Sequence, residues 1–401
     1  MSRPESSAGT DVVIIGAGYA GVIAANRLRS SLTEQEAERV RITMVNPRRD
    51  FVERIRLHEL AAGSRDTAAI PLHDVLHRDV HLVEGMAERI DPRASTVDVR
   101  SAAGERHFHY DLLIYAVGST ASAAIAGSRH HAFLLADLDG AERARDAIGG
   151  GAPGQRVVVI GGGLTGVEAA SEIAEQHPLA NVTLLSSGPI LETMRPSARR
   201  SVTRTLGRLH VAIEADARVD RIEPKVVELA DGRSMPFDVC VVAASFSVPD
   251  LARVSGLDVD PTGRLQVDET LRSTSSPSVI GAGDATVLPA SVGSHLRMGC
   301  AIALPLGGHA AETAVALLRG RPPQPVSIGF AVQCISLGRK RGYIQAVQAD
   351  DTPRPFHLSG RPAAWFKEYI CRLVVTGPRK ERTKPGAYRS PAGPSTMRIS
   401  R

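Results

Sequence analysis

The chain has 401 residues, of which 43% are hydrophobic and 23% are charged, and its net charge at pH 7 is +5. This length predicts two or three domains, and the composition excludes a mainly disordered or fibrous chain. Almost all of the positive charge comes from arginines spread along the chain, and no recognisable nucleic-acid motif accompanies them, so we expect no nucleic-acid partner.

The N-terminal segment MSRPESSAGT is polar and lacks the apolar core of a secretory signal. No run of about 18 apolar residues is free of charge, so we expect no transmembrane helix. The cysteines lie far apart, without a CxxC pair or the spacing of a metal site, and a reducing cytoplasm is the simplest interpretation. They are Cys240, Cys300, Cys334 and Cys371.

The first predicted elements are a strand at residues 11–15, a helix to about residue 28 and a second strand, RITMVN, from residue 41. The strand-to-helix turn has the pattern G-x-G-x-x-G, in which the glycines permit a tight turn, close approach of a pyrophosphate and close helix–strand packing. The helix N-terminus offers free N–H groups to the anion, so this βαβ unit predicts a dinucleotide site. The turn consists of Gly16, Ala17, Gly18, Tyr19, Ala20 and Gly21.

The segment RRDFVERIRLHELAAG, residues 48–63, follows this unit and is rich in arginine. On a helix, Arg54 and His58 would share one face at i, i+4 spacing. Surface salt bridges with Glu53 and Glu59 are the alternative to a role in binding an anion. Further on, His107 and His109 alternate on a predicted strand without a companion at metal-site spacing, so we expect no metal.

A second βαβ unit starts with a strand at residues 156–160, followed by a helix to about residue 176 and the strand VTLLS. Two units indicate two dinucleotides, and a flavin and a nicotinamide must meet for a hydride to pass between them. One unit is therefore expected to hold FAD and the other NADPH or NADH. The second turn consists of Gly161, Gly162, Gly163, Leu164, Thr165 and Gly166.

The second strand of such a unit usually ends in a carboxylate that binds ribose hydroxyls. In the first unit this position is Asn46, whose amide can still bond a ribose, and in the second it is Ser186, followed by Ser187. Without a carboxylate, nothing repels a 2′-phosphate, which favours NADPH or tolerance of both nucleotides. We expect arginines in the next loop to assist, unless they form a solvated face; they are Arg195, Arg199 and Arg200.

A third motif, SPSVIGAGDATVLP, places Gly283 and Asp284 at a strand end. With it, the chain resembles the two-dinucleotide-binding flavoproteins of the pyridine nucleotide-disulfide oxidoreductase superfamily over about residues 11–320. The stretch GGGLTGVEAASEIAE is most similar to type II NADH dehydrogenases and apoptosis-inducing-factor-like reductases.

The resemblance implies that the N-terminal glycine turn binds FAD and that Asp284 bonds its ribityl chain. It also places the arginine-rich segment beside the pyrophosphate and the flavin. Glu168, in TGVE, matches a glutamate near the nicotinamide, which it would orient; a carboxylate interacting with its own helix dipole is the alternative. The implied cofactor-binding positions are the two turns, Asn46, Arg54, Ala87, Gly118, Ser186, Ser187, Gly283 and Asp284.

The expected fold class is α/β, with two Rossmann-like dinucleotide-binding domains and a smaller α+β C-terminal region. FAD-binding residues would come from 1–120 and 240–320, the NAD(P) domain from 121–239, and the C-terminal domain from 321–401. In the C-terminal domain, VQCISLGRKRGYIQAV predicts strands with a turn and RPAAWFKEYICRLVV an amphipathic helix.

Two departures from the family bear on the acceptor. The helix after the FAD turn has no redox-active cysteine pair, so electrons are expected to leave the flavin directly. Glutamines of the quinone site of type II NADH dehydrogenases are replaced by Ala301 and Pro305, which puts a family-type quinone site in doubt. Cys300, in the same stretch, is either a reactive thiol near the flavin or a buried structural cysteine.

The predicted C-terminal helix carries an apolar stripe, with Lys367 and Arg372 off it, and the resemblance invites a peripheral membrane contact. Packing against the same chain or in a homodimer is the alternative. The stripe consists of Trp365, Phe366, Tyr369, Ile370, Leu373 and Val374.

The leading hypothesis is an FAD-dependent NAD(P)H oxidoreductase that reduces a quinone or another small-molecule electron acceptor. One alternative is a reductase that passes electrons to a ferredoxin-like protein through a basic surface around LGRKRGY, residues 337–343. Another is a redox-slow flavin-binding sensor. We expect a cytoplasmic location, with contact to the inner face of the membrane as an open alternative.

Overall fold

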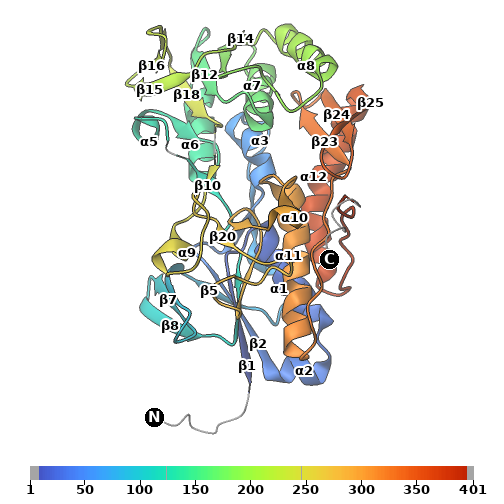
Figure 1. The fold of residues 1–401 in the computed structure, drawn as a ribbon. Helices are drawn as coiled ribbons and strands as arrows, with labels where there is room; N and C mark the ends of the chain where they lie inside the picture. Colours follow the sequence, from blue (N-terminus) through green and yellow to red (C-terminus); the bar gives the residue numbers. More distant parts are fainter. Residues whose placement is uncertain (1–8, 123, 245, 395–401) are drawn as a thin grey trace.

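Two five-stranded parallel sheets form the frame of the computed structural model, which describes residues 9–122, 124–244 and 246–394 (Figure 1). Their inner strands are mainly Val, Ile and Leu with buried side chains, as in a sheet covered on both faces, whereas most of the edge strands are partly exposed. In both sheets the first strand of the βαβ unit lies in the centre, with its successor on one side and a later strand on the other. Open α/β sheets bind ligands in the crevice at the carboxyl ends of the strands, at the point where the strand order reverses.

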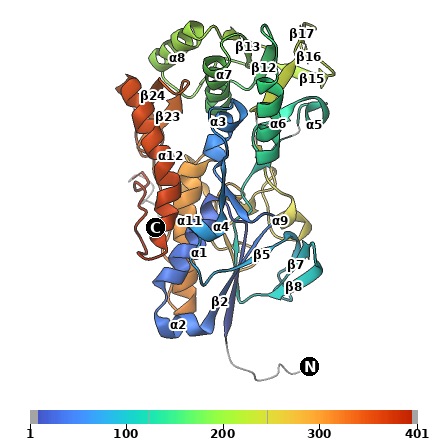
Figure 2. The ribbon, with the colours of Figure 1, turned by 180° about the vertical axis from the view of Figure 1, so that it is seen from behind.

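The first sheet is assembled from both ends of the chain. Helices α1 (Tyr19–Ser31) and α11 (Cys300–Leu318) pack against each other on one side of it, and the antiparallel strands β6, β7 and β8 lie on the other (Figures 1 and 2). Its strand order is β21 (Val279–Gly281), β9 (Leu112–Tyr115), β1 (Thr10–Ile15), β2 (Val40–Asn46) and β5 (His81–Glu84). The flanking strands are β6 (Met86–Asp91), β7 (Thr96–Ser101) and β8 (Gly104–His109).

The second sheet lies above the first in Figure 1, and the short pair β10 (Thr120–Ala121) and β19 (Phe246–Ser247) connects the two. Its order is β11 (Phe133–Leu134), β18 (Val239–Val242), β12 (Arg156–Ile160), β13 (Asn181–Leu185) and β14 (Ala212–Glu214). Its helices are α6 (Leu138–Gly149), α7 (Leu164–Gln176) and α8 (Pro196–Arg208), and β15 (Val219–Glu223), β16 (Val226–Leu229) and β17 (Ser234–Pro236) form a sheet beside it. Because β18 pairs with β12, the expected domain boundary at residue 240 falls inside a strand of this sheet.

The C-terminal region consists of an antiparallel sheet and the long helix α12 (Arg361–Glu381), which also packs against α1. The predicted strands are β23 (Val332–Ser336) and β24 (Gly342–Val347), and a third strand that was not predicted, β25 (Pro353–Gly360), completes the sheet. The predicted fold class is confirmed.

Short elements complete the described chain. They are α2 (Glu34–Arg39), β3 (Asp50–Val52), η1 (Arg54–Arg56), α3 (Leu57–Ala61), β4 (Ala69–Pro71), α4 (Leu72–Val75), α5 (Ser128–His131), α9 (Leu251–Val254), β20 (Leu265–Gln266), β22 (Thr286–Val287) and α10 (Ala290–Gly293). Arg54 and His58 do not share one α-helix, because Arg54 lies in a 3-10 turn, η1, that precedes the short helix α3 with His58.

Candidate functional site

The first glycine turn leaves an open space at the N-terminus of α1. Gly16 has a positive φ of +100°, and a side chain there or at Gly21 would collide with backbone atoms. A Cβ added at Gly18, by contrast, would meet no atom within 4 Å. The outer glycines therefore keep strand and helix close together, whereas the space beside Gly18 is open, which would fit a pyrophosphate.

Asn46 braces this turn. Its Oδ1 accepts a hydrogen bond of 2.9 Å from the backbone N–H of Ala17, and its Nδ2 donates one of 2.7 Å to the carbonyl of Arg48. Gly118, just after β9, has a positive φ of +67°, and a Cβ added there would meet no atom within 4 Å. Ala87 lies in β6, paired with Val99, two residues after Gly85, whose N–H donates to the carbonyl of Asn46.

The second glycine turn repeats the first. Gly161 has a φ of +131°, a side chain at Gly166 would collide with the backbone of Gly161, and Gly163 faces open space. At the end of β13, Ser186 is buried against Gly162, whereas Ser187 is exposed. This second open turn fits the pyrophosphate of a second dinucleotide.

The arginines expected in the loop after Ser187 are placed differently from the prediction. Arg195 is the N-cap residue of α8, and Arg199 and Arg200 belong to that helix. Pro196, at the first helical position, starts the helix here because its fixed φ suits this position.

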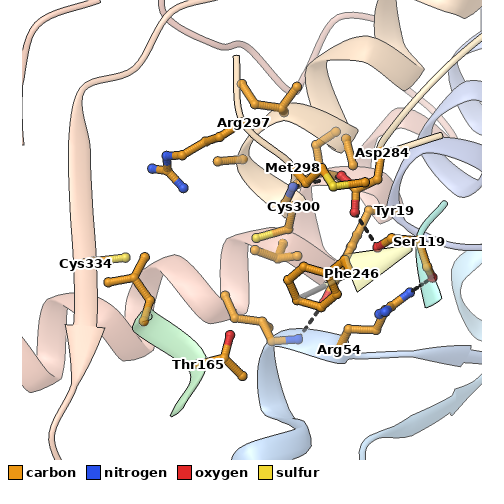
Figure 3. Close-up of a pocket in the computed structure, with 18 of the residues that line it drawn as sticks. Tyr19, Arg54, Ser119, Thr165, Phe246, Asp284, Arg297, Met298, Cys300 and Cys334 are labelled. Atoms are coloured by element: carbon orange, nitrogen blue, oxygen red, sulfur yellow. Dashed lines mark hydrogen bonds between the residues drawn. The ribbon is translucent and has the colours of Figure 1, made fainter. Parts of the chain in front are cut away.

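A cavity of about 460 Å³ lies where the two sheets and the C-terminal region meet, and Figure 3 shows side chains from all three parts. Its wall is mainly apolar, which is typical of a cofactor or small-molecule site. From the first unit come Tyr19, Arg54, Ser119, Asp284 and Cys300; from the second, Leu164, Thr165, Glu168 and Ala243; from the C-terminal region, Phe330, Cys334, Lys367 and Ile370.

Asp284 reaches this cavity from the loop after β21 (Figure 3). Its Oδ2 accepts a hydrogen bond of 2.7 Å from the Ser119 hydroxyl, and its Oδ1 accepts one of 2.8 Å from the N–H of Gly299 at the start of α11. A carboxylate has about four acceptor positions, so both oxygens can still accept from hydroxyl groups of a ligand. The preceding Gly283 has a φ of +80° and faces Ala20 of α1.

Arg54 provides a fixed positive charge in the cavity. It donates from Nη1 to the carbonyl of Ser119, and its Nη2 is buried without a hydrogen-bond partner among the described residues. Burial lowers the pKa of Arg54, although Asp284 offsets part of this effect. The residue is absent from the ion pairs of the described chain, so the alternative of a surface salt bridge does not apply to it. A buried donor without a partner fits an acceptor atom supplied by the cofactor.

Sequence reasoning missed the partners of Glu168. Its Oε1 lies 3.1 Å from Nζ of Lys367 and accepts hydrogen bonds of 3.0 Å and 3.2 Å from the backbone N–H and the hydroxyl of Ser336. Lys367 was predicted to lie off the apolar stripe of its helix, and it is nevertheless buried in the fold. Only 6% of Lys367 is exposed, because the buried carboxylate of Glu168 compensates its charge. The neighbouring sequence could not predict this pair, because the two residues are far apart in the chain.

The Glu168–Lys367 pair is ionised. Burial alone would raise the pKa of Glu168, but Lys367 and the Ser336 N–H outweigh it, and the pKa lies below its ordinary value. Burial alone would lower the pKa of Lys367, but surrounding groups that include Glu168 raise it above the ordinary value. His58, which contacts the Ser336 hydroxyl, has its pKa lowered by burial, so it is neutral near pH 7.

Cys300 is half-buried and lines the cavity at the start of α11, opposite Cys334 (Figure 3). Burial raises the pKa of the Cys300 thiol to about 11, so the thiol is protonated at neutral pH. This property argues against a reactive thiolate.

The two positions at which type II NADH dehydrogenases are expected to carry glutamines lie on α11 in this chain. Ala301 lines the cavity, whereas Pro305 is buried inside the helix. By length and composition alone, α11 could cross a membrane, although no transmembrane helix was expected. The helix packs against α1 and 61% of it is buried in the fold, so this is weak evidence for a span.

One exposed cluster was not foreseen from sequence spacing. The ligand atoms of Asp11, His109 and Asp111 lie within 4.8 Å of one another. Arg41 already pairs with Asp11 at 2.7 Å, and the N–H of Asp11 donates to Asp111.

The comparisons with known proteins agree with this geometry. The family model described as pyridine nucleotide-disulphide oxidoreductase matches residues 10–302. An NADH dehydrogenase-like protein of Mycobacterium tuberculosis is 29% identical over 382 residues, which cover 90% of this chain and 93% of the relative. The ferredoxin–NAD(+) reductase component of the biphenyl dioxygenase system of Paraburkholderia xenovorans is 29% identical over 303 residues, 71% of this chain and 69% of the relative.

Among solved structures, the sulfide:quinone oxidoreductase of Aquifex aeolicus superposes with a TM-score of 0.78. The two chains are 20% identical, and the match covers 94% of this chain and 93% of the other. At this identity the likeness concerns the fold.

Proposed function

The chain belongs to the pyridine nucleotide-disulphide oxidoreductase family, and from this premise we propose that it is an FAD-dependent NAD(P)H oxidoreductase that reduces a small electron acceptor. The observation that carries the proposal is that two glycine turns open toward one cavity. Thr165 from the second turn and Tyr19 from the first line the same space. Two dinucleotides held this way bring their redox rings together.

In this proposal FAD, when bound, supplies the two-electron chemistry that accepts the hydride of NAD(P)H. The protein binds and orients both nucleotides. The first turn and the N-terminus of α1 hold the FAD pyrophosphate, Asp284 accepts hydroxyl groups of its ribityl chain, and the free Nη2 of Arg54 donates to a cofactor acceptor. Residues 1–120 and 240–320 would thus serve FAD, and 121–239 would serve NAD(P)H.

Glu168 has the role of a positioning residue beside the nicotinamide. Its carboxylate is held on the cavity wall by Lys367 and Ser336, so it cannot swing into the nucleotide site without losing three contacts. A fixed carboxylate at this point orients the carboxamide side of the nicotinamide ring and keeps hydride transfer on one face.

NADPH is the proposed reductant, with NADH tolerated. Support comes from Ser186 and Ser187, which replace the carboxylate that would repel a 2′-phosphate. Arg195 at the start of α8 is exposed and free of ion pairs in the described chain, so it remains available for the phosphate.

The apolar wall supports a flat, apolar acceptor such as a quinone. Phe330, Ile370 and Val374 line the side of the cavity formed by the C-terminal region. Anaerobic stopped-flow mixing with NADPH tests the proposal, followed by reoxidation with a soluble quinone. We expect fast bleaching of the flavin and fast reoxidation; a flavin that NADPH and NADH reduce only over minutes would indicate a sensor and refute the enzyme proposal.

A ferredoxin-like acceptor is the second candidate, supported by the reductase relative and by exposed Lys340 and Arg341 in the β23–β24 turn. The predicted basic surface is smaller than its sequence indicates, because Arg339 is engaged by Glu59 and Glu172. Rapid reoxidation by a ferredoxin, abolished at high salt, together with slow reoxidation by quinones would favour this candidate.

Helix α12 supports a further interaction. Its buried side packs in the fold, whereas Trp365, Tyr369 and Leu373 are exposed by 72%, 49% and 36% and form what we name the outer face of α12. An exposed aromatic and aliphatic face beside basic residues suits a membrane surface, or a second copy of the chain in a homodimer. Peripheral contact with the inner face of the membrane of a cytoplasmic protein is the arrangement we propose.

A further inference from the structure

A buried glutamine lies on the wall of the cavity between the two glycine turns, which we name the redox cavity. Gln333, the second residue of β23, is only 3% exposed and belongs to the side formed by the C-terminal region. Its Oε1 is buried without a hydrogen-bond partner, and its Nε2 donates to no atom in the described part of the chain. A buried amide of this kind is expected to find its partners in a ligand.

The glutamine on the neighbouring strand is held differently. Gln345 lies directly opposite Gln333 in β24 and is 1% exposed. Its Nε2 donates to the backbone carbonyls of Ala346, Arg354 and Phe356, where β24 and β25 change register, although its Oε1 also has no partner. Gln345 is absent from the wall of the redox cavity. The antiparallel sheet therefore anchors Gln345 through its amide nitrogen, whereas it offers Gln333 no such contact.

Gln333 lies beside the second βαβ unit. Strand β23 packs against α7, the helix that starts at the second glycine turn. Ile335, on the same face of β23 as Gln333, is buried in one apolar cluster with residues of α7. Figure 3 shows the adjacent Cys334 on the side of the cavity that carries Thr165, whereas Asp284 lies on the opposite side. Gln333 thus belongs to the half of the cavity in which we place the nicotinamide nucleotide.

The chemistry of the free amide indicates which group it receives. Its Oε1 needs a donor and its Nε2 needs an acceptor. A phosphate or a carboxylate supplies acceptors only. A primary carboxamide supplies both, through its NH2 group and its carbonyl, and the nicotinamide ring carries such a group.

We propose that Gln333 binds the carboxamide of the nicotinamide, with Oε1 accepting from its NH2 group. The inference rests on the proposed function, because it assumes that a nicotinamide nucleotide enters the cavity. Together with the fixed carboxylate of Glu168, this contact restricts rotation of the ring, which transfer of the hydride from one face requires. Gln333 would thereby select nucleotides by their carboxamide.

Equilibrium binding tests this contact without turnover. Oxidised, FAD-loaded protein is titrated in a calorimeter with NADP⁺ and with its 3-acetylpyridine analogue, which keeps the carbonyl but has a methyl group in place of NH2. NAD⁺ and its analogue are measured in parallel. We expect the wild type to prefer the natural nucleotide. Gln333→Met, which keeps the size of the side chain, should weaken binding of the natural nucleotide by about fivefold or more and binding of the analogue less, so that the preference is lost.

Two further measurements separate this role from a structural one. Gln333→Met should not lower the melting temperature of the nucleotide-free protein, because it removes buried polar atoms that have no partner. Gln345→Met is the matched control: it should lower the melting temperature, because three carbonyls lose their donor, and leave the preference between the two nucleotides unaltered. The affinity for FAD, measured by reconstitution, should be the same in Gln333→Met as in the wild type.

The inference is overturned if Gln333→Met keeps the preference of the wild type, or if it weakens both nucleotides equally. It is also overturned if the substitution lowers the affinity for FAD instead, which would place the edge of the flavin ring against Gln333. A wild-type protein that binds none of these nucleotides would refute the proposed function as well. The failure of this inference is thereby distinguished from the failure of the proposed function.

Discussion

Replacing Lys367 by methionine tests the buried ion pair that supports the redox cavity. Methionine keeps most of the side-chain volume but removes the charge that compensates Glu168, which is 6% exposed. Breaking such a pair from one side costs roughly 3–5 kcal/mol. Because two hydrogen bonds from Ser336 remain on the carboxylate, we expect a loss at the lower end, about 3 kcal/mol at pH 7.

The loss has a defined dependence on pH. In the wild type, the pKa of Glu168 is lowered in the folded state, so the ionised carboxylate stabilises the fold at pH values above its unfolded pKa of 4.5. This stabilisation is lost as the pH falls through the folded pKa. Without Lys367, burial raises this pKa above 4.5, so the variant gains a proton in the folded state and its deficit shrinks as the pH is lowered from 7 toward 5. The raised pKa of Lys367 adds no pH dependence in this window, because lysine is charged in both states.

Urea unfolding followed by circular dichroism at pH 7 and pH 5 measures this effect. Lys380→Met, an exposed change on the same helix, is the matched control. Glu168→Gln/Lys367→Met should recover most of the stability, because it leaves no buried charge unpaired. The reasoning is refuted if Lys367→Met costs no more than Lys380→Met, or if its cost is the same at both pH values.

The remaining predictions concern the cofactors, the thiol and α12. Gly18→Val should give folded but colourless protein, because its side chain fills the pyrophosphate space. Gly149→Val, at an open position on α6, should still load FAD. Absorbance at 450 nm after reconstitution measures the loading, and equal loading of the two variants contradicts the assignment. Ser186→Glu should lower the ratio of kcat/KM for NADPH over NADH by about tenfold or more through like-charge repulsion. Thr203→Glu, an exposed change in the middle of α8, should leave this ratio unaltered. An unchanged ratio in Ser186→Glu shows that this position does not read the 2′-phosphate. The rate at which iodoacetamide alkylates Cys300, measured by mass spectrometry, should be low at pH 8 and rise toward pH 11, since burial raises the pKa of this thiol to about 11. Fast labelling at pH 7 would disprove its protonated state. Serine substitutions across the outer face of α12 should abolish binding to anionic liposomes with the fold intact. If the unsubstituted protein does not bind liposomes and the substitutions convert a dimer to a monomer, the outer face is a homodimer interface instead.

The sequence by itself determined the two dinucleotide-binding units. The turns at Gly16–Gly21 and Gly161–Gly166 could be located because the need for glycine is local: a positive φ, a close helix–strand contact and an open space all concern neighbouring residues. Runs of Val and Ile before each turn predicted β1 and β12 correctly for the same reason, since a strand buried on both faces must be apolar throughout. The late Gly283–Asp284 motif was predicted to bind the ribityl chain, and Asp284 lines the cavity.

Only the tertiary structure decided what surrounds these units. Ser119 and Gly299 lie 165 and 15 residues from Asp284 in the chain, and their hydrogen bonds to it exist only because β9, β21 and α11 meet. Helical periodicity gave α12 an apolar stripe but could not tell which side packs in the fold. The buried side carries Lys367, because its partner Glu168, from α7, is placed there by folding. A charge is buried or exposed according to what the fold places beside it, and that neighbour is set by long-range packing rather than by adjacent residues.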